Sequence, residues 1–259
     1  MRTSQLKVIY HDVYLTDYAT ASCECPQRVS CIMEVLREHY SVVKPSAALD
    51  EDILLVHSPS ILNRVRQDRE LYLAAATAAG GALLAAKMAS TGEPAFAAVR
   101  PPGHHASPAS HWGFCFFNNV AIAIEKLVRT RLISQALVLD IDLHFGDGTD
   151  NFFSDRPDVA VANIQDNNRE RFLENVERAL SANEYDIIAI SAGFDRHEAD
   201  WGRTLTTQDY FTIGRSVRDH ALAQCDGKYF AVLEGGYNIE VLGANALALC
   251  RGMDPAWEA

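Results

Sequence analysis

Two aspartates and a histidine alternate along one short segment of this 259-residue chain. Asp140, Asp142 and His144 lie at the end of an apolar run, and side chains two residues apart in a strand start on the same face. Carboxylate oxygens and imidazole nitrogens are ligands that zinc accepts, and a catalytic zinc site uses three of them and leaves room for water. Asp142, His144 and one more acid would meet that requirement, and Asp195, in a glycine-containing turn, is the best placed. The alternation alone fits a solvated strand end almost as well, so the case for a metal site depends on the distant acid.

A pair of adjacent histidines, His104 and His105, follows the stiff turn Pro101-Pro102-Gly103. Beside a metal-activated water, two imidazoles can serve as a general base and as an electrostatic partner. Each needs an acceptor on its other ring nitrogen, because that hydrogen bond sets the tautomer. Asp140 and Asp147 are the spare carboxylates for this task. Without such a setting, adjacent histidines are usually ordinary surface or core residues.

Tyr237 follows two glycines, Gly235 and Gly236, near the end of the chain. A phenol beside the metal can donate a hydrogen bond to a carbonyl oxygen as negative charge develops on it. The glycines would let the backbone approach closely and turn the ring inward. Taken alone, a Gly-Gly-Tyr turn is also common in exposed loops.

These residues must be brought together by the elements that precede them. Short β-rich runs alternate with longer amphipathic ones, which predicts a single α/β domain over residues 1–259 with a mostly parallel sheet flanked by helices. The predicted strands are Lys7–Tyr10, Ile53–Val56, Ala95–Val99, Ala136–Ile141, Val159–Ile164, Ile187–Ile190 and Tyr229–Leu233, and the predicted helices are Gln27–Tyr40, Leu71–Ala89, Asn118–Thr130, Glu170–Ala182, Thr207–Gln224 and Glu240–Cys250. The polar clusters follow the third, fourth, sixth and seventh of these strands. Ligands bind at the carboxyl ends of strands in such sheets, so we expect the clusters to meet in one crevice.

Composition narrows the function classes. Hydrophobic residues make up 48% and charged residues 22% of the chain, as in a soluble globular protein. The formal net charge of −11 disfavours nucleic acid and anionic membranes as partners and weakly favours cationic ones. The six cysteines lack zinc-knuckle spacing and suit a reducing compartment. With neither an apolar signal segment nor a run near membrane-span length, the sequence predicts a cytoplasmic protein.

Five strings in this order resemble those of the histone deacetylase family, which includes prokaryotic deacetylases and acetylpolyamine amidohydrolases. They are RPPGHHA (Arg100–Ala106), GFCFFNNVAIA (Gly113–Ala123), LDIDLHFGDGT (Leu139–Thr149), SAGFD (Ser191–Asp195) and EGGYN (Glu234–Asn238). The resemblance covers almost the whole chain. It implies the three-layer arginase/deacetylase fold and hydrolysis of an acylated amine, whether an acyl-lysine peptide or a small acylated amine.

Carried over residue by residue, the resemblance implies one Zn²⁺ per chain. The implied roles are Asp142, His144 and Asp195 as zinc ligands, His104 and His105 as active-site histidines oriented by Asp140 and Asp147, Tyr237 as the group that polarises the carbonyl, and Gly113 and Phe114 as the lining of the acyl-lysine channel. His105 would be the general base and then the general acid. The family also commonly carries a structural K⁺ near the Asp140–His144 segment.

Three departures from the family pattern bear on the substrate. The chain is short, and after Arg66 it passes almost at once into a helix, without a match to the family's rim aspartate. Phe145 replaces a histidine common beside the metal-ligand histidine, and its side chain should point away from the metal. Trp201 lies near the position where polyamine-selective relatives carry an acidic gatekeeper, which argues against polyamine selectivity.

Other functions remain open at this point. An acetylpolyamine or other small amide is the alternative substrate. A ureohydrolase with two manganese ions would share the fold but need further bridging acids. A catalytically silent acyl-lysine binding module is the alternative from another class. The sequence leaves the oligomeric state and the acyl-chain length undetermined.

Overall fold

The computed structural model describes residues 6–257 and contains one seven-stranded sheet in which every pairing is parallel. The strands are β1 (Lys7–Ile9), β2 (Ser41–Val43), β3 (Ala95–Ala97), β4 (Ala136–Asp140), β5 (Val159–Asn163), β6 (Ile187–Ala192) and β7 (Tyr229–Leu233). Their order across the sheet is β2-β1-β3-β7-β6-β4-β5. This matches the predicted parallel sheet.

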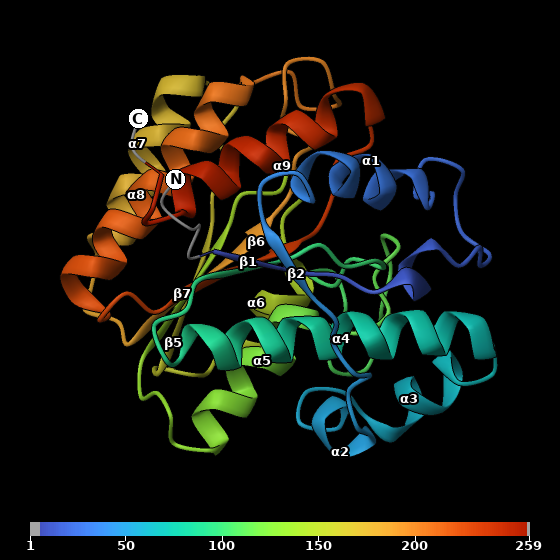
Figure 1. Ribbon diagram of the computed structural model, residues 1–259. Helices are drawn as coiled ribbons and strands as arrows, with labels where there is room; N and C mark the ends of the chain where they lie inside the picture. The colour runs from blue at the N-terminus through green and yellow to red at the C-terminus, as the bar shows by residue number, and fades with distance from the viewer. Residues whose placement is uncertain (1–5, 258–259) are drawn as a thin grey trace.

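Helices cover both faces of the sheet and make a three-layer α/β fold (Figure 1). One layer contains α1 (Gln27–Leu36), α7 (Arg169–Leu180), α8 (Thr207–Gln224) and α9 (Ile239–Met253). The other contains α2 (Asp50–Ile53), α3 (Pro59–Val65), α4 (Arg69–Ala89), α5 (Asn119–Arg129) and α6 (Asp147–Phe153). A short 3-10 helix, η1 (Asp12–Leu15), follows β1.

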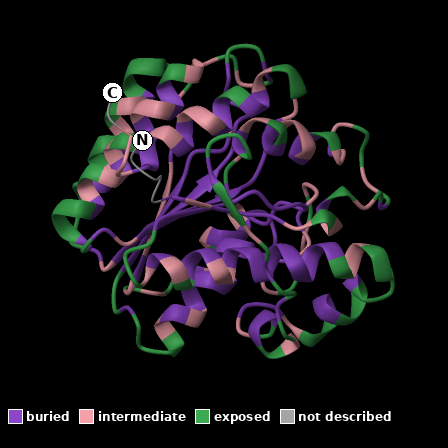
Figure 2. Cartoon of the chain, in the orientation of Figure 1, coloured by how far each residue is buried: buried purple, intermediate pink, exposed green. Residues whose placement is uncertain are grey.

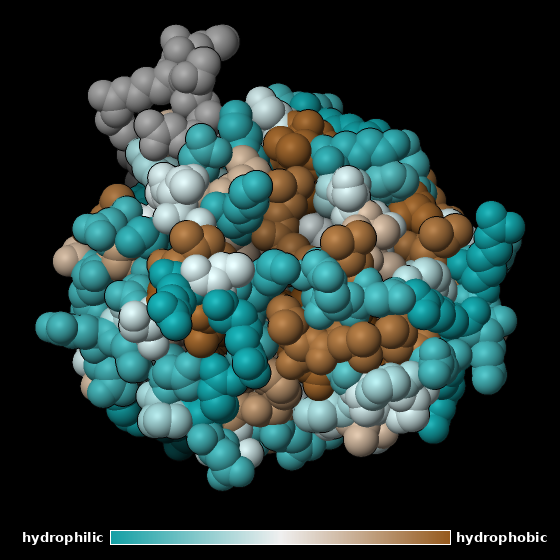
Figure 3. All heavy atoms as spheres, turned by 90° about the horizontal axis from the view of Figure 1, so that it is seen from below, coloured by the Kyte–Doolittle hydropathy of each residue, from teal (hydrophilic) through white to brown (hydrophobic). Residues whose placement is uncertain are grey.

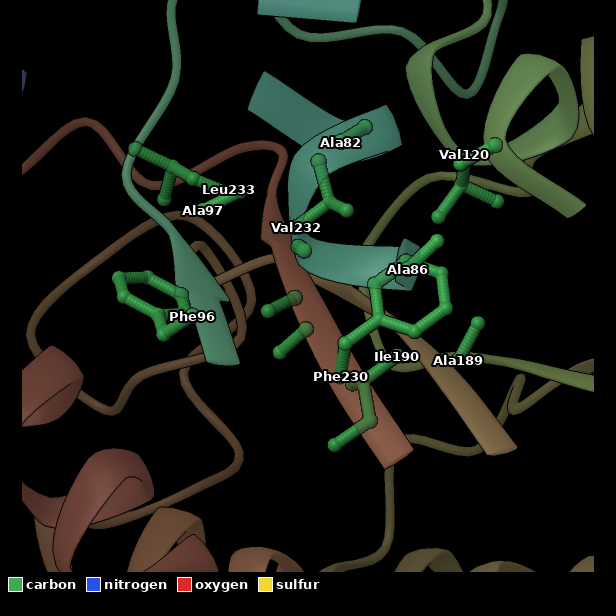
Figure 4. Packing of buried hydrophobic residues seen from close by; sticks show 14 of the residues in the cluster. Ala82, Ala86, Phe96, Ala97, Val120, Ala189, Ile190, Phe230, Val232 and Leu233 are labelled. Carbon is green, nitrogen blue, oxygen red and sulfur yellow. The ribbon is translucent and has the colours of Figure 1, made fainter. Parts of the chain in front are cut away.

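The central strands are buried on both faces, as their apolar sequences require. Every residue of β4, β6 and β7 is buried, and Figure 2 shows buried residues filling the space between the two helical layers. Phe230 of β7 packs against Ala82 and Ala86 of α4, and Phe96 of β3 packs into the core on the other face of the sheet (Figure 4). This packing fixes where the carboxyl ends of the strands lie.

Two glycines let α4 lie close to its neighbours. A Cβ on Gly80 would lie 1.9 Å from the carbonyl oxygen of Ser46, and one on Gly81 would lie 2.7 Å from Val99 Cγ1. This close packing offsets the cost of two glycines within a helix.

The expectation that no segment approaches the length of a membrane span is wrong for α4. By length and composition alone, this helix could cross a membrane. However, 61% of its most apolar stretch is buried inside the protein, as in a core helix of a globular fold. The face that α2–α5 cover shows hydrophobic surface among hydrophilic side chains (Figure 3).

One element was predicted wrongly and several were not predicted. Ile53–Val56 is no strand, because Ile53 ends α2 and a turn follows it; an apolar run this short does not separate a strand from a helix by pattern. β2 was missed because it is a three-residue edge strand whose residues are mostly exposed. The short helices α2, α3 and α6 were also missed.

Candidate functional site

The four polar clusters follow four strands that are neighbours in the sheet, in the order β3, β7, β6 and β4. Because all four strands run parallel, their carboxyl ends lie along one edge. The clusters therefore meet over the centre of the sheet, as the sequence predicted.

Asp142, His144 and Asp195 present three ligand atoms within 4.8 Å of one another. His144 Nδ1 lies 3.3 Å from Asp142 Oδ1 and 3.0 Å from Asp195 Oδ2. Both carboxylates are fully buried, whereas 38% of the His144 side chain is exposed. Asp195 Oδ2 has no partner in hydrogen-bond geometry although it is buried. Two buried carboxylates and an imidazole around such an atom fit a divalent cation.

The backbone at Gly235 passes so close to the two carboxylates that no side chain fits there. The Gly235 amide donates to Asp142 Oδ2 at 2.8 Å. A Cβ on Gly235 would lie 2.6 Å from that same oxygen and 2.9 Å from Asp195 Oδ2. This residue must therefore be glycine for both carboxylates to keep their positions.

The charges in the cluster also favour a cation. Burial and repulsion by Asp142 raise the pKa of Asp195 to about 7. A hydrogen bond to Asp142 and the carboxylate of Asp195, 3.0 Å away, raise the pKa of His144 to about 10. In the absence of a metal, Asp195 and His144 thus hold protons at this site, and a bound divalent cation would displace them.

Each of the two adjacent histidines has its own carboxylate, in the pairing that the sequence predicted. His104 Nδ1 lies 3.0 Å from Asp140 Oδ2, and His105 Nδ1 lies 2.7 Å from Asp147 Oδ1. The two imidazole rings lie 4.0 Å apart between centroids, and His104 Nε2 is 3.8 Å from Asp142 Oδ1. Both side chains are almost fully buried.

The two histidines differ in charge. Burial opposes protonation of His104, but the carboxylates of Asp142 and Asp140 outweigh it and raise the pKa of His104 well above its ordinary value. Burial and the charge on His104 lower the pKa of His105 to about 4. At neutral pH, His104 is therefore the cationic ring and His105 the neutral one.

Tyr237 lies on a loop that a buried arginine anchors. Arg28 donates from Nε to the carbonyl oxygen of Gly236 at 2.6 Å and from Nη2 to that of Glu234 at 2.5 Å. Its guanidinium also lies 4.9 Å from the centroid of the Tyr237 ring. Burial raises the pKa of Tyr237, so that the phenol keeps its proton. The sequence motifs assigned Arg28 no role.

Trp201 stacks on the outer side of Tyr237, with ring centroids 4.1 Å apart and an interplanar angle of 18°. The tryptophan ring is half exposed and also contacts His144 edge-on at 5.9 Å. A hollow of about 630 Å³ lies beside this stack and is lined by Ala199, Asp200, Trp201, Arg203, Tyr237 and Asn238. Phe145 is exposed, as expected for a side chain that points away from the metal ligands.

The turn that contains Gly113 and Phe114 brings aromatic side chains against both His105 and Tyr237. Gly113 and Phe114 have φ values of 59° and 67°, and a Cβ on Gly113 would lie 2.4 Å from His105 Cδ2. Phe114 meets Tyr237 edge-on at 6.0 Å. Trp112 lies over His105 with ring centroids 3.9 Å apart, and its Nε1 donates to Asp147 Oδ2 at 2.8 Å. The sequence motifs gave Trp112 no role in the chemistry.

Glu234 is a second buried residue without a predicted role. Its Oε2 accepts from the backbone amides of Gly103 at 2.6 Å and His104 at 3.1 Å, which ties the β7 end to the histidine turn. Burial raises the pKa of Glu234 to about 7. Glu234 also lies near His104 and Cys115 in a second group of potential metal ligands, but the amides already occupy its carboxylate. All six cysteines, Cys115 included, are free thiols.

Residues 22–172 and 163–253 match the family described as the histone deacetylase domain. A probable deacetylase of Methanothermobacter thermautotrophicus is 33% identical over 82% of this chain and 78% of its own length. Histone deacetylase 14, chloroplastic, of Arabidopsis thaliana is 31% identical over 69% of this chain, which corresponds to 51% of that longer protein.

The fold is also that of a solved structure, the crystal structure of the HDA15 HD domain. The two superpose with a TM-score of 0.86 over 97% of this chain and 90% of the other, at 22% identity. This likeness supports the three-layer arrangement, and the sequence matches supply the family. The chain therefore belongs to the histone deacetylase family.

Proposed function

We propose that this chain hydrolyses acylated amines, with acyl-lysine side chains as the substrate, and that one zinc ion serves the reaction. Asp142, His144 and Asp195 would hold the ion. The supporting observation is the buried Asp195 Oδ2, which no donor meets in hydrogen-bond geometry although the imidazole nitrogen of His144 lies 3.0 Å away and a second buried carboxylate is close by. When bound, zinc would activate a water molecule and polarise the acyl carbonyl.

His105 would carry the proton in this reaction. Asp147 holds its Nδ1, so the proton would travel through Nε2. As the neutral ring, His105 can take a proton from the water as the new carbon–oxygen bond forms. It would then return that proton to the leaving nitrogen as the amide bond breaks, giving a free amine and a carboxylate.

Two further groups would stabilise negative charge on the acyl oxygen. Tyr237 would donate its phenolic proton in a hydrogen bond. His104, kept cationic by Asp140 and Asp142, would add a fixed positive charge nearby. Gly113 and Phe114 would form one side of the channel for the acyl-lysine chain, with Trp201 and Tyr237 on the other.

Acyl-lysine is proposed ahead of acetylpolyamine because the half-exposed group at the rim is the neutral indole of Trp201. A two-manganese ureohydrolase is disfavoured because the second group of potential ligands includes Glu234, whose carboxylate binds two backbone amides. One metal ion per chain, measured by elemental analysis, would agree with the proposal, and two would contradict it.

The experiment is a substrate panel for the zinc-loaded protein: acetyl- and longer acyl-lysine peptides beside acetylated polyamines. The matched control is Asp195→Asn, which keeps the shape of the side chain but removes its charge. We expect acyl-lysine hydrolysis that this variant loses. Faster hydrolysis of acetylpolyamines would replace the proposed substrate, and uniform inactivity of folded, metal-loaded protein would favour a silent binding module.

A further inference from the structure

The residue after the proposed metal ligand Asp195 is a buried arginine that binds backbone carbonyls rather than a carboxylate. Arg196 is 1% exposed. Its guanidinium donates to four carbonyl oxygens: from Nε to Asp142 at 3.1 Å, from Nη1 to Asp166 at 3.1 Å, and from Nη2 to Ile164 at 3.0 Å and Leu143 at 3.3 Å. No carboxylate lies within ion-pair distance of it in the described part of the chain.

Converging carbonyl oxygens are the ligands that proteins use for a monovalent cation such as K⁺. Two of the four carbonyls belong to the Asp140–His144 segment, where the family resemblance led us to expect a structural K⁺. The other two, of Ile164 and Asp166, follow the adjacent strand β5. The positive charge that these carbonyls contact is therefore the guanidinium of Arg196, which is part of the chain itself.

The contacts of Arg196 connect the loops that carry the proposed metal ligands. The carbonyls of Asp142 and Leu143 immediately precede His144, and Asp195 is the neighbour of Arg196 in the chain. The backbone of Arg196 is held too, because its carbonyl accepts from the amides of Thr204 and Leu205 at 2.9 Å each. On its other side the guanidinium lies 4.9 Å from the ring of Phe172 on α7. A lysine ammonium has three donors on one atom and could not reach all four carbonyls.

We infer that the Arg196 guanidinium acts as a built-in monovalent cation that positions the metal-ligand loop, so that this protein needs no K⁺ near Asp140–His144. Arg196 is a positioning residue in this scheme: it acts on the proposed site through the Asp142–His144 backbone. The inference rests on the proposed function only for the identity of the metal ligands.

The test compares the thermal midpoint and the zinc affinity of the protein in KCl and in tetramethylammonium chloride at equal ionic strength. Neither measurement needs turnover, so failure of this inference is distinguishable from failure of the proposed deacylation. We expect the wild-type midpoint to agree within about 1 °C and the zinc dissociation constant within about twofold in the two salts, because the proposed site already holds its charge. A wild-type protein that K⁺ markedly stabilises would overturn the inference.

The second part of the test removes the Arg196 side chain. Arg196→Ala should bind zinc at least about 10-fold more weakly in tetramethylammonium chloride, a loss typical of groups that support metal ligands. Added K⁺, or guanidinium ion at low millimolar concentration, should restore part of that loss. The control is Arg215→Ala, which removes an exposed arginine that packs on Phe211 and should show neither loss nor rescue.

If Arg196→Ala does not fold, Arg196→Lys keeps the charge but should recover only part of the zinc affinity. Wild-type zinc affinity in both of these variants, or a loss that neither ion restores, would contradict the inference.

Discussion

Replacing Gly235 with alanine should abolish metal binding while leaving the fold intact. The added Cβ would lie 2.6 Å from Asp142 Oδ2 and 2.9 Å from Asp195 Oδ2, so the new methyl group would enter the space between two proposed ligands. A carbon–oxygen contact needs roughly 3.4 Å. The Asp142 oxygen would therefore have to retreat by about 0.8 Å and the Asp195 oxygen by about 0.5 Å.

Displacements of this size exceed what a metal site tolerates, because metal–ligand distances vary by only about 0.2 Å. We expect zinc affinity to fall at least 100-fold, or about 2.7 kcal/mol. The backbone itself should accept alanine, since Gly235 has no positive φ. The loss should therefore appear in metal binding and much less in the stability of the metal-free protein.

The assay is competition for zinc against a chelator of known affinity, with circular dichroism as the check on folding. Gly92→Ala is the control: Gly92 has a φ of 81°, so alanine strains the backbone there, but the nearest atom to a new Cβ is 3.7 Å away. That variant should bind zinc normally. Tight zinc binding by folded Gly235→Ala would refute the assignment of Asp142 and Asp195 as joint ligands.

Three further predictions test other parts of the site and its support. Tyr237→Phe should keep zinc but lose about 100- to 1000-fold in kcat on acyl-lysine peptides, because it removes one donor to the oxyanion; wild-type turnover would exclude that role. Trp112→Phe keeps a ring over His105 but removes the hydrogen bond to Asp147, so kcat should fall about 10-fold with KM unchanged. The control variant Trp257→Phe should change neither kcat nor KM. A change in KM alone would assign Trp112 to substrate binding. Burial lowers the pKa of His57 to about 4, so the unfolded chain takes up a proton there at a higher pH than the folded protein does. The contribution of His57 to the free energy of unfolding should therefore be fully present above about pH 6.5 and fall by about 3 kcal/mol as the pH drops toward 4. In urea unfolding, His57→Gln should make the free energy of unfolding less dependent on pH over this range. An unchanged pH dependence would contradict the reasoning.

Much of the fold followed from local pattern. The nearly continuous apolar runs at β4, β6 and β7 predicted buried parallel strands, because a strand covered by helices on both faces needs apolar residues at every position. The polar residues just beyond those runs were therefore expected at one edge of the sheet. Short elements such as α2 and β2 escaped prediction, since three or four residues carry too little periodicity to identify them.

The order and spacing of five motifs were enough to predict which residues would gather, down to the pairing of His104 with Asp140 and His105 with Asp147. The sequence could not reveal what supports them. Arg28 reaches the Tyr237 loop from 208 residues away, and Arg196 gathers carbonyls from two different strand ends. The spacing of apolar residues along a segment indicates which side of that helix or strand is buried. A hydrogen bond between distant segments depends on how the elements pack, and backbone carbonyls carry no side-chain signature, so only the tertiary structure decided these contacts.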